Sequence, residues 1–268
     1  MQRIGNSKMY KRSLLQYVRE YRFALWELTK RELKRKYARS YMGILWSIFY
    51  PLLRMILVVI MFSVVFSKGI EKYPAYYFAG FLLFECFSTA TTTSLTCLKD
   101  NRDFLFKTKL PREILVLSRI LTAFVNTLLG FIPFILVLII YRAKITVYIL
   151  LMPVIFLLFL LFIAGTSYAL AIIYVVFPDI KDIHSNVIFI LRFFVAIFYS
   201  IDWITKGVQN FIIHNPLYAF IKLTRDCMVY GTKPEVFFII EIVVWSLGLY
   251  LFGKMLFKLC VNRIIERL

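Results

Sequence analysis

The sequence predicts an all-α membrane protein with six transmembrane helices, an N-terminal amphipathic interface helix and a re-entrant helix pair between spans five and six. The first observation is composition: 61% of the 268 residues are hydrophobic and the mean hydropathy is +0.76. Soluble domains carry roughly 45–50% apolar residues, so too little polar surface remains here to cover a soluble globule. The second observation is a set of apolar runs that each reach the length of about 20 residues needed to cross a bilayer as a helix.

Six apolar runs divide the chain into the elements of one membrane domain. They cover about residues 43–67, 75–98, 114–141, 145–177, 183–201 and 236–257. The fourth is long enough to tilt or to bend at Pro153 or Gly165. We see neither an internal repeat nor a linker in the sequence. We therefore expect a cytoplasmic amphipathic interface segment at 1–42, a transmembrane domain at 43–257 and a cytoplasmic tail at 258–268.

Basic residues set the expected orientation of these spans. Lys and Arg favour one set of connections over the other by about three to one, and such an excess marks the cytoplasmic side. Residues 1–42 carry most of the excess, so both termini are predicted to be cytoplasmic. The net charge of +18 would also suit a nucleic-acid binder. The basic residues lie between apolar runs rather than on one soluble face, however, so we expect no nucleic-acid partner.

Residues 13–37 are predicted to form the interface helix. Apolar positions fall at helical spacing and cations fill much of the remaining face, as in helices that lie with one side in lipid and the other toward anionic headgroups. The apolar positions are Leu14, Leu15, Val18, Tyr21, Leu25, Leu28 and Leu33. A helix that only anchors the topology would show the same pattern, so both interpretations stay open at this stage.

The stretch that enters the first span has a specific pattern. KRKYARSYMGILWSIFYPLLRMILVVIMFSVVFS (34–67) resembles the opening of the polysaccharide-export permeases, the membrane subunits of type-2 ABC transporters. The matching positions are Tyr37, Ser40, Gly43, Trp46, Pro51, Leu52, Leu53, Phe66 and Ser67. The likeness continues, in the family's order, in NRDFLFKTKLPREILVLSRIL (101–121), VFPDIKDI (176–183) and NPLYAFIKLTRD (215–226). The chain departs from the family at 196–199, where Ala-Ile-Phe-Tyr lacks the usual proline near the outer gate.

The resemblance implies the permease subunit of an ATP-driven exporter in the plasma membrane of a bacterium or archaeon. Its cargo would be a lipid-linked cell-surface polysaccharide, such as O-antigen, capsule, teichoic acid or another wall polymer. The family architecture implies a second copy of the permease and two ATPase subunits. This chain would then bind no cofactor, and ATP and Mg²⁺ would be held by the ATPase partner. The stretch 248–255 looks like a P-loop, but Met255 lacks the hydroxyl that must follow the lysine, and we expect helix-packing glycines there.

The first cytoplasmic loop is the expected contact for the ATPase. Aromatic residues flanked by charges suit insertion into a partner's groove, and the resemblance implies a coupling helix at this place. The coupling residues are Asp100, Asn101, Arg102, Asp103, Phe104, Leu105 and Phe106. From the residues alone, an amphipathic loop resting on lipid headgroups is equally open.

An enzyme is the alternative function. Asp100-x-x-Asp103 and Asp179-x-x-Asp182 place carboxylate pairs on two cytoplasmic loops. Mg²⁺-dependent integral-membrane prenyl- or phospho-glycosyl transferases hold diphosphates through such pairs, because hard oxygen ligands suit Mg²⁺. Cations crowd both pairs and a third aspartate is missing from the pattern. We therefore expect a transport subunit without an enzymatic centre.

Charged and aromatic residues inside the spans are the channel candidates. At about 1.5 Å per residue, Arg54 and Glu85 lie about 17 and 20 Å from the inner edge. Because these depths match, the two residues could form a buried ion pair between spans one and two that lines the channel. A purely structural pair is the competing interpretation. Aromatic rings could contact the C–H faces of sugars, although packing explains any single ring as well. The channel candidates are Trp46, Phe49, Tyr50, Arg54, Glu85, Phe194, Phe198 and Tyr199.

Residues 202–235 form the one long outer connection and the candidate outer gate. Apolar residues recur at near-helical spacing, with breaks at Gly207 and at 214–216. Two short helices would be too polar to span but could dip into the outer leaflet, since irregular backbone is tolerated there when it packs on protein. The matching family region forms such a re-entrant pair; a loop on the headgroups is the alternative. The gate residues are Trp203, Phe211, Asn215, Pro216 and Leu217.

Overall fold

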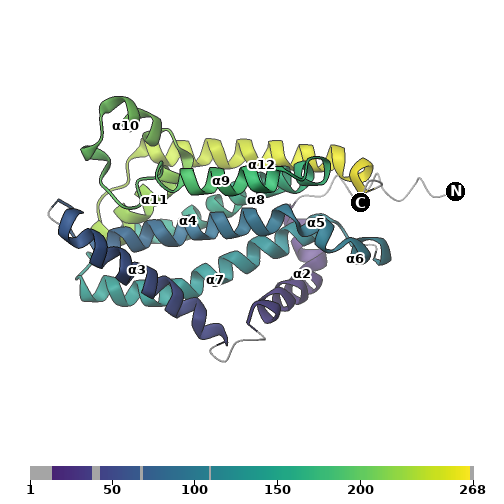
Figure 1. Ribbon diagram of the computed structural model, residues 1–268, viewed down its shortest axis with the longest axis horizontal. Helices are drawn as coiled ribbons and strands as arrows, with labels where there is room; N and C mark the ends of the chain where they lie inside the picture. Colours follow the sequence, from purple (N-terminus) through teal and green to yellow (C-terminus); the bar gives the residue numbers. More distant parts are fainter. Residues whose placement is uncertain (1–13, 38–42, 67–68, 109, 266–268) are drawn as a thin grey trace.

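Helices make up all the regular structure in the part of the chain that is described (Figure 1). The computed structural model describes residues 14–37, 43–66, 69–108 and 110–265. The all-α prediction is confirmed for these residues. Parts of the predicted terminal segments, at 1–13, 38–42 and 266–268, lie outside the described residues, as do Ser40 and Ser67 of the first motif.

The long helices match most of the predicted elements. They are α2 (Leu14–Tyr37), α3 (Trp46–Phe66), α4 (Tyr73–Leu95), α7 (Glu113–Ile140), α8 (Met152–Val176) and α12 (Val236–Ile265). Shorter helices connect them: α5 (Cys97–Asp100), α6 (Arg102–Lys107), α9 (Ile180–Leu191), α10 (Lys206–Ile213) and α11 (Pro216–Arg225). Single turns flank several of these helices: η1 (Gly43–Leu45), η2 (Val147–Leu151), η3 (Ile201–Trp203) and the π-helical η4 (Asp226–Tyr230).

Three of the described helical segments are long and apolar enough to cross a membrane. They cover Glu113–Ile140, Val147–Val176 and Val236–Val261, which are the predicted spans three, four and six. Helices also lie where spans one and two were expected. The described apolar part of α3 is shorter, Trp46–Met61, and α4 carries a run of Ser and Thr in its second half. The predicted fourth span does not bend at Pro153, because that residue lies in the first turn of α8, where proline is tolerated.

The prediction of one continuous helix over 183–201 is wrong. Helix α9 ends at Leu191, and residues 192–200 form turns in which Ala196 has a φ of 47°. The reason is that carbonyl groups in this segment accept hydrogen bonds from distant side chains instead of from the next helical turn. Arg225 Nη2 donates to Ala196 O and Ile197 O at 3.0 and 3.2 Å. The apolar sequence gives no sign of this break.

Helices α8 and α12 pack along each other, and α4 packs along α7 (Figure 1). Two glycines explain the first contact: a Cβ at Gly165 would collide with the backbone of Leu249, and one at Gly253 with the backbone of Gly165. The P-loop-like stretch is therefore part of a helix interface, as expected for Gly253. Lys254 Nζ lies 3.3 Å from the Tyr250 hydroxyl on the same helix.

Helix α2 is confirmed as a helix, but one part of its expected environment is wrong. Leu25 and Leu28 are buried by protein, where α2 packs on α7, rather than facing lipid. Phe23 and Trp26 on the same helix are exposed. In Figure 1, α5 and α6 lie at one end of the helical bundle, near the end of α12, whereas α10 and α11 lie toward the opposite end. The candidate coupling and gate residues are thus far apart.

Candidate functional site

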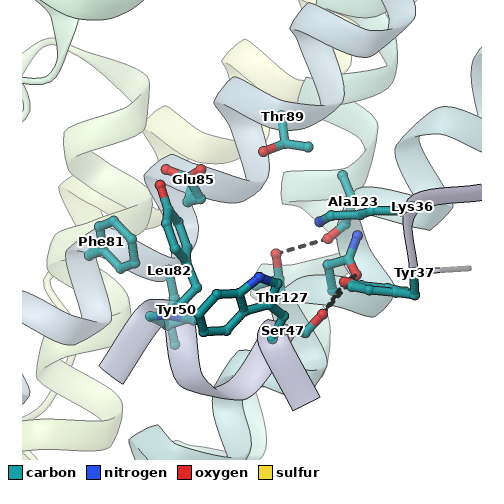
Figure 2. A pocket seen from close by; sticks show the side chains of 13 residues that line it. Lys36, Tyr37, Ser47, Tyr50, Phe81, Leu82, Glu85, Thr89, Ala123 and Thr127 are labelled. Atoms are coloured by element: carbon teal, nitrogen blue, oxygen red, sulfur yellow. Dashed lines mark hydrogen bonds between the residues drawn. The ribbon is translucent and has the colours of Figure 1, made fainter. Parts of the chain in front are cut away.

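A cavity of about 340 Å³ lies between α2, α3, α4 and α7 (Figure 2). Its walls combine aromatic rings, hydroxyl groups and one carboxylate. The lining residues are Lys36, Tyr37, Trp46, Ser47, Tyr50, Pro51, Phe81, Leu82, Glu85, Thr89, Ala123, Asn126 and Thr127. Three channel candidates from two predicted spans, Trp46, Tyr50 and Glu85, therefore share one cavity. We call it the inner cavity.

Hydrogen bonds tie the first motif to the wall of the inner cavity. The Tyr37 hydroxyl donates to Asn126 Oδ1 at 2.6 Å and also contacts Ser47 Oγ (Figure 2). Ser47 lies on the first turn of α3 and Asn126 on α7. The end of α2 is therefore joined through Tyr37 to both helices, which fixes the position of this wall.

Arg54 and Glu85 form the ion pair that their matched depths predicted. Arg54 Nη1 lies 3.8 Å from Glu85 Oε2, and each side chain is about a third exposed. The guanidinium carbon of Arg54 also lies 4.6 Å from the centre of the Tyr50 ring, within the range of a cation–π contact. The pairing is confirmed but the pair is only partly buried, and its role in a channel stays a prediction.

A second cavity, also about 340 Å³, adjoins the inner cavity and shares Lys36, Thr89, Ala123 and Asn126 with it. An ionic network lines its wall. Arg119 Nη1 on α7 lies 2.6 Å from Glu32 Oε2 on α2, and Arg119 Nη2 lies 3.5 Å from Asp100 Oδ2 on α5. Glu32 and Arg119 are 6% and 12% exposed, so this is a largely buried pair.

The candidate coupling residues separate into two groups. Asp100 and Asn101 are held by the bundle: Asp100 accepts a hydrogen bond from the Thr96 hydroxyl at 2.8 Å, and Asn101 Oδ1 accepts one from Arg31 at 2.8 Å. Phe104 and Leu105 are half-buried against the apolar core. By contrast, Arg102, Asp103 and Phe106 are exposed, with Phe106 60% exposed. A partner could therefore reach the second group.

The eight channel candidates do not line one cavity. Phe194, Phe198 and Tyr199 lie in the turns after α9, and Phe49 is exposed on α3 without lining the inner cavity. A row of rings connects the two groups. Arg54 lies 5.9 Å from the Phe81 ring, Phe81 stacks with Tyr77 at 5.7 Å, and Tyr77 stacks with Phe198 at 5.7 Å. Phe81 and Tyr77 are buried, so this row is closed to solvent in one chain.

Arg225, which the resemblance placed with Asp226 on the pattern of the gate region but to which no role was assigned, organises the end of the molecule that holds the gate residues. Its side chain is 2% exposed, donates from Nε to Tyr76 O at 3.1 Å and lies 3.4 Å from the centre of the Tyr76 ring. The Tyr76 hydroxyl in turn donates to Tyr199 O at 2.7 Å. Gly80 leaves space for Arg225, because a Cβ there would lie 2.9 Å from Nη2. The only signal in the sequence was its place in the NPLYAFIKLTRD stretch.

The gate candidates lie around two short helices, α10 and α11. Asn215 caps α11, since its Oδ1 accepts from Leu217 N at 3.0 Å, and Pro216 is the first residue of that helix. Leu217 is buried, whereas Phe211 and Trp203 are exposed. Phe211 meets the channel candidate Phe194 edge-on at 5.7 Å. The break predicted at 214–216 is therefore confirmed, whereas the one predicted at Gly207 is wrong, because Gly207 lies in the first turn of α10. A position within a membrane stays a prediction.

Next to the gate candidates, Lys222 and Asp226 form a close ion pair with a nitrogen–oxygen distance of 2.9 Å. Asp226 is 3% exposed. Burial holds the pKa of the Asp226 carboxyl above its usual range, although the Lys222 ammonium acts in the opposite direction. The pair joins the end of α11 to η4.

Comparison with known proteins connects this arrangement to a family. The model of the ABC-2 type transporter family matches residues 23–229, from α2 through the inner cavity to the gate candidates. The chain belongs to the ABC-2 type transporter family. The O-antigen export system permease protein RfbA of Myxococcus xanthus is 34% identical to it over 192 residues, 71% of this chain and 74% of that protein. The protein of the same name from Klebsiella pneumoniae is 25% identical over 236 residues, 86% of this chain and 91% of its own.

The family assignment disfavours the alternative enzyme in this ABC-2 protein, and the geometry of the aspartates agrees with that. Asp100 faces Arg119 and Thr96, and Asp103 is exposed on α6. Asp179 and Asp182 lie at the start of α9 and are both exposed. Among the described residues, no group of three or more His, Cys, Asp or Glu side chains has an arrangement that could hold a metal ion.

Proposed function

We propose that this chain is the membrane-spanning permease subunit of an ATP-driven exporter for a lipid-linked cell-surface polysaccharide. The observation that carries this proposal is the ABC-2 family match over residues 23–229 together with relatives named as O-antigen export permeases. The proposed cargo belongs to the class of O-antigen, capsule, teichoic acid or a related wall polymer. The prenyl- or phospho-glycosyl transferase remains the less favoured alternative.

In the proposed topology the chain crosses the plasma membrane six times. Helices α3 and α4 join the three long apolar helices, and α9 with the turns at 192–200 completes the fifth crossing. Irregular backbone is tolerated at membrane depth where protein covers it, and Ala196 and Ile197 are buried. Helices α10 and α11 form the outer re-entrant pair. Both termini are cytoplasmic, which is supported by the cations in the last turn of α2.

The proposed exporter contains two copies of this permease and two ATPase subunits. The exposed side of α6, around Phe106, supports an ATPase contact at the cytoplasmic end. ATP and Mg²⁺ belong to the ATPase, and this chain binds no cofactor. A second permease copy is supported by the row of rings from Tyr50 to Phe198, because a polymer needs an open path and Tyr77 and Phe81 in this row are buried in the described part of one chain. Lipids contact the remaining apolar faces.

The test is export in a host that lacks its own O-antigen permease. The chain is expressed with a candidate ABC ATPase subunit from the same organism, and surface polysaccharide is measured by antibody binding to intact cells. We expect surface polymer only when both subunits are present and the ATPase can hydrolyse ATP. Export that persists with a hydrolysis-deficient ATPase would contradict the proposal, as would Mg²⁺-dependent transferase activity of the purified chain alone.

A further inference from the structure

A third cavity, with a polar lining, lies at the opposite end of the molecule from α5 and α6, among η3, α10, α11, η4 and the start of α12. We call it the outer cavity. Its volume is about 400 Å³, within the range of about 300–1,000 Å³ that small-molecule sites occupy. It shares none of its lining residues with the inner cavity. Its polar lining includes Asp202, Gln209, Lys222, Asp226 and Glu235.

The back wall of the outer cavity is fixed before any ligand arrives. Arg225 lines the cavity, but its guanidinium is committed to the carbonyl oxygens of Tyr76, Ala196 and Ile197. A further anchor lies beyond η4, where Gly231 has a φ of 64° and a Cβ would collide with Lys144 O. The Thr146 hydroxyl donates to Gly231 O at 3.3 Å. A wall held from several elements loses little entropy when a ligand binds.

The charges around the outer cavity do not favour an anion. Three carboxylates, those of Asp202, Asp226 and Glu235, face the cations Lys222 and Arg225. Lys222 is already paired with Asp226 at 2.9 Å and lies 3.9 Å from Glu235. A phosphate or an acidic sugar would therefore meet more negative than available positive charge. Carboxylates are strong acceptors for hydroxyl donors, so a neutral polyol is favoured instead.

Aromatic rings complete the lining. Tyr218 and Phe238 meet edge-on at 5.9 Å, and Tyr230 contributes a further ring. An aromatic face carries partial negative charge and attracts the C–H groups of an apolar ring face. A pyranose ring presents such a face together with hydroxyl groups at its edge. The combination of rings and carboxylates in one cavity matches both sides of a sugar.

We propose that the outer cavity binds one neutral sugar unit of the exported polymer, with Asp202 and Glu235 accepting hydrogen bonds from its hydroxyls and Tyr218 and Phe238 packing on its ring. This inference rests on the proposed function. By holding this sugar unit, the outer cavity retains the polymer on the outer side, so that a polymer moved outward by one step does not slide back.

The test measures binding to the complex of permease and ATPase in lipid nanodiscs. Saturation-transfer NMR is recorded with methyl glycosides of mannose, galactose and glucose, and with galacturonate and inorganic pyrophosphate as anions. We expect saturable binding of at least one neutral glycoside. Because each lost bond to a charged acceptor weakens binding by about tenfold, Asp202→Asn or Glu235→Gln should raise the Kd by that factor. Glu27→Gln on α2, an exposed carboxylate outside the outer cavity and outside the predicted ATPase contact, is the matched control and should leave the Kd unchanged.

The outcomes separate this inference from the proposed function. No saturable binding of the neutral glycosides, equal binding by the double variant Asp202→Asn/Glu235→Gln, or tighter binding of either anion would overturn the sugar site. If one of these results is obtained while wild-type export is intact, the proposed function stands and only the sugar site is lost. If glycosides bind as expected but no polymer reaches the surface with the ATPase present, the proposed function fails and the binding site remains.

Discussion

Arg225 places a full positive charge where only 2% of the side chain is exposed, and its surroundings explain why the charge is tolerated. Three carbonyl oxygens and the face of Tyr76 replace the water that the guanidinium loses. Sequence reasoning could place Arg225 only in a motif, because its partners lie 28, 29 and 149 residues away along the chain. A residue's local neighbours carry no information about such contacts.

We expect Arg225→Met to lower the thermal unfolding midpoint of the detergent-purified protein. The carbonyls of Tyr76, Ala196 and Ile197 lose the guanidinium as donor, at about 1–3 kcal/mol for each buried group left unpaired; Ala196 O keeps a second donor, the Tyr76 hydroxyl at 3.2 Å. Arg225→Lys should recover only part of the loss, because an ammonium cannot reproduce the planar fork of the guanidinium. Fluorescence-detected size exclusion after heating measures the midpoint. Arg102→Met, at an exposed position, is the control; equal midpoints for Arg225→Met and wild type would show that the contacts do not stabilise the fold.

Arg54 and Glu85 illustrate a residue pair that sequence reasoning could find, because rise per residue along two antiparallel helices sets their relative depth. Both side chains are about a third exposed, so we expect only a small effect of the pair on stability. The expected effect is on export: Glu85→Gln leaves Arg54 without its counter-ion next to apolar surroundings. The double variant Arg54→Met/Glu85→Gln removes both charges and should export more than Glu85→Gln alone. The opposite ranking, measured as surface polysaccharide, would indicate that Arg54 acts independently of Glu85.

At the scale of elements, apolar length and periodicity identified the long helices but not where they break or what covers them. The segment 183–201 is mostly apolar, yet α9 ends at Leu191 because Arg225 and Tyr76 bind the carbonyls that follow. Similarly, the apolar face of α2 predicted contact with lipid, whereas Leu25 and Leu28 pack on α7. An apolar face indicates burial, but its partner is set by tertiary structure.

The ionic contact between α2 and α7 leads to a prediction about how α2 is held. Glu32 and Arg119 are mostly buried, and removing one partner of such a pair costs about 3–5 kcal/mol. We therefore expect Glu32→Gln to release α2, seen as faster hydrogen exchange over residues 21–37 and a lower unfolding midpoint. The exposed pair Glu27–Lys30 on the same helix offers a matched control, so Glu27→Gln should change neither quantity. Unchanged exchange in Glu32→Gln would mean that apolar packing alone holds the helix.

The structure also sharpens the expected contact between α6 and the ATPase. Phe106 is 60% exposed, whereas Phe104 and Leu105 are half-buried against the core. We expect Phe106→Glu to reduce co-purification of the ATPase while the permease stays folded and inserted, because a charge replaces the exposed apolar anchor. The control is Phe23→Glu on α2, because Phe23 is 76% exposed and lies outside the predicted contact. Loss of the ATPase with the control but not with Phe106→Glu would move the docking site to α2.

At the scale of the whole molecule, a row of rings runs from Tyr50 and Phe81 at the inner cavity through the buried Tyr77 to Phe198 in the turns after α9. The composition predicted a lipid environment, and the motifs predicted the family, but neither predicted that the row would be closed in one chain. Phe81 and Tyr77, both on α4, are buried by the helices that pack against α4. No pattern along the sequence encodes this packing. The path for a polymer must then be completed by movement or by a second copy.

The proposed orientation gives a prediction for the whole molecule, because it places the α10–α11 end outside and the α5–α6 end in the cytoplasm. In a background with all four cysteines replaced by alanine, we expect Lys206→Cys and Asn210→Cys to react with a membrane-impermeant maleimide on intact spheroplasts. Asp103→Cys and Lys107→Cys are as exposed in the fold but should react only after the membrane is permeabilised. Since all four positions are accessible to solvent in one chain, any difference between them reports the membrane rather than burial. Labelling of Asp103→Cys but not Lys206→Cys on intact cells would reverse the orientation inferred from the cations, and would also place the outer cavity on the cytoplasmic side.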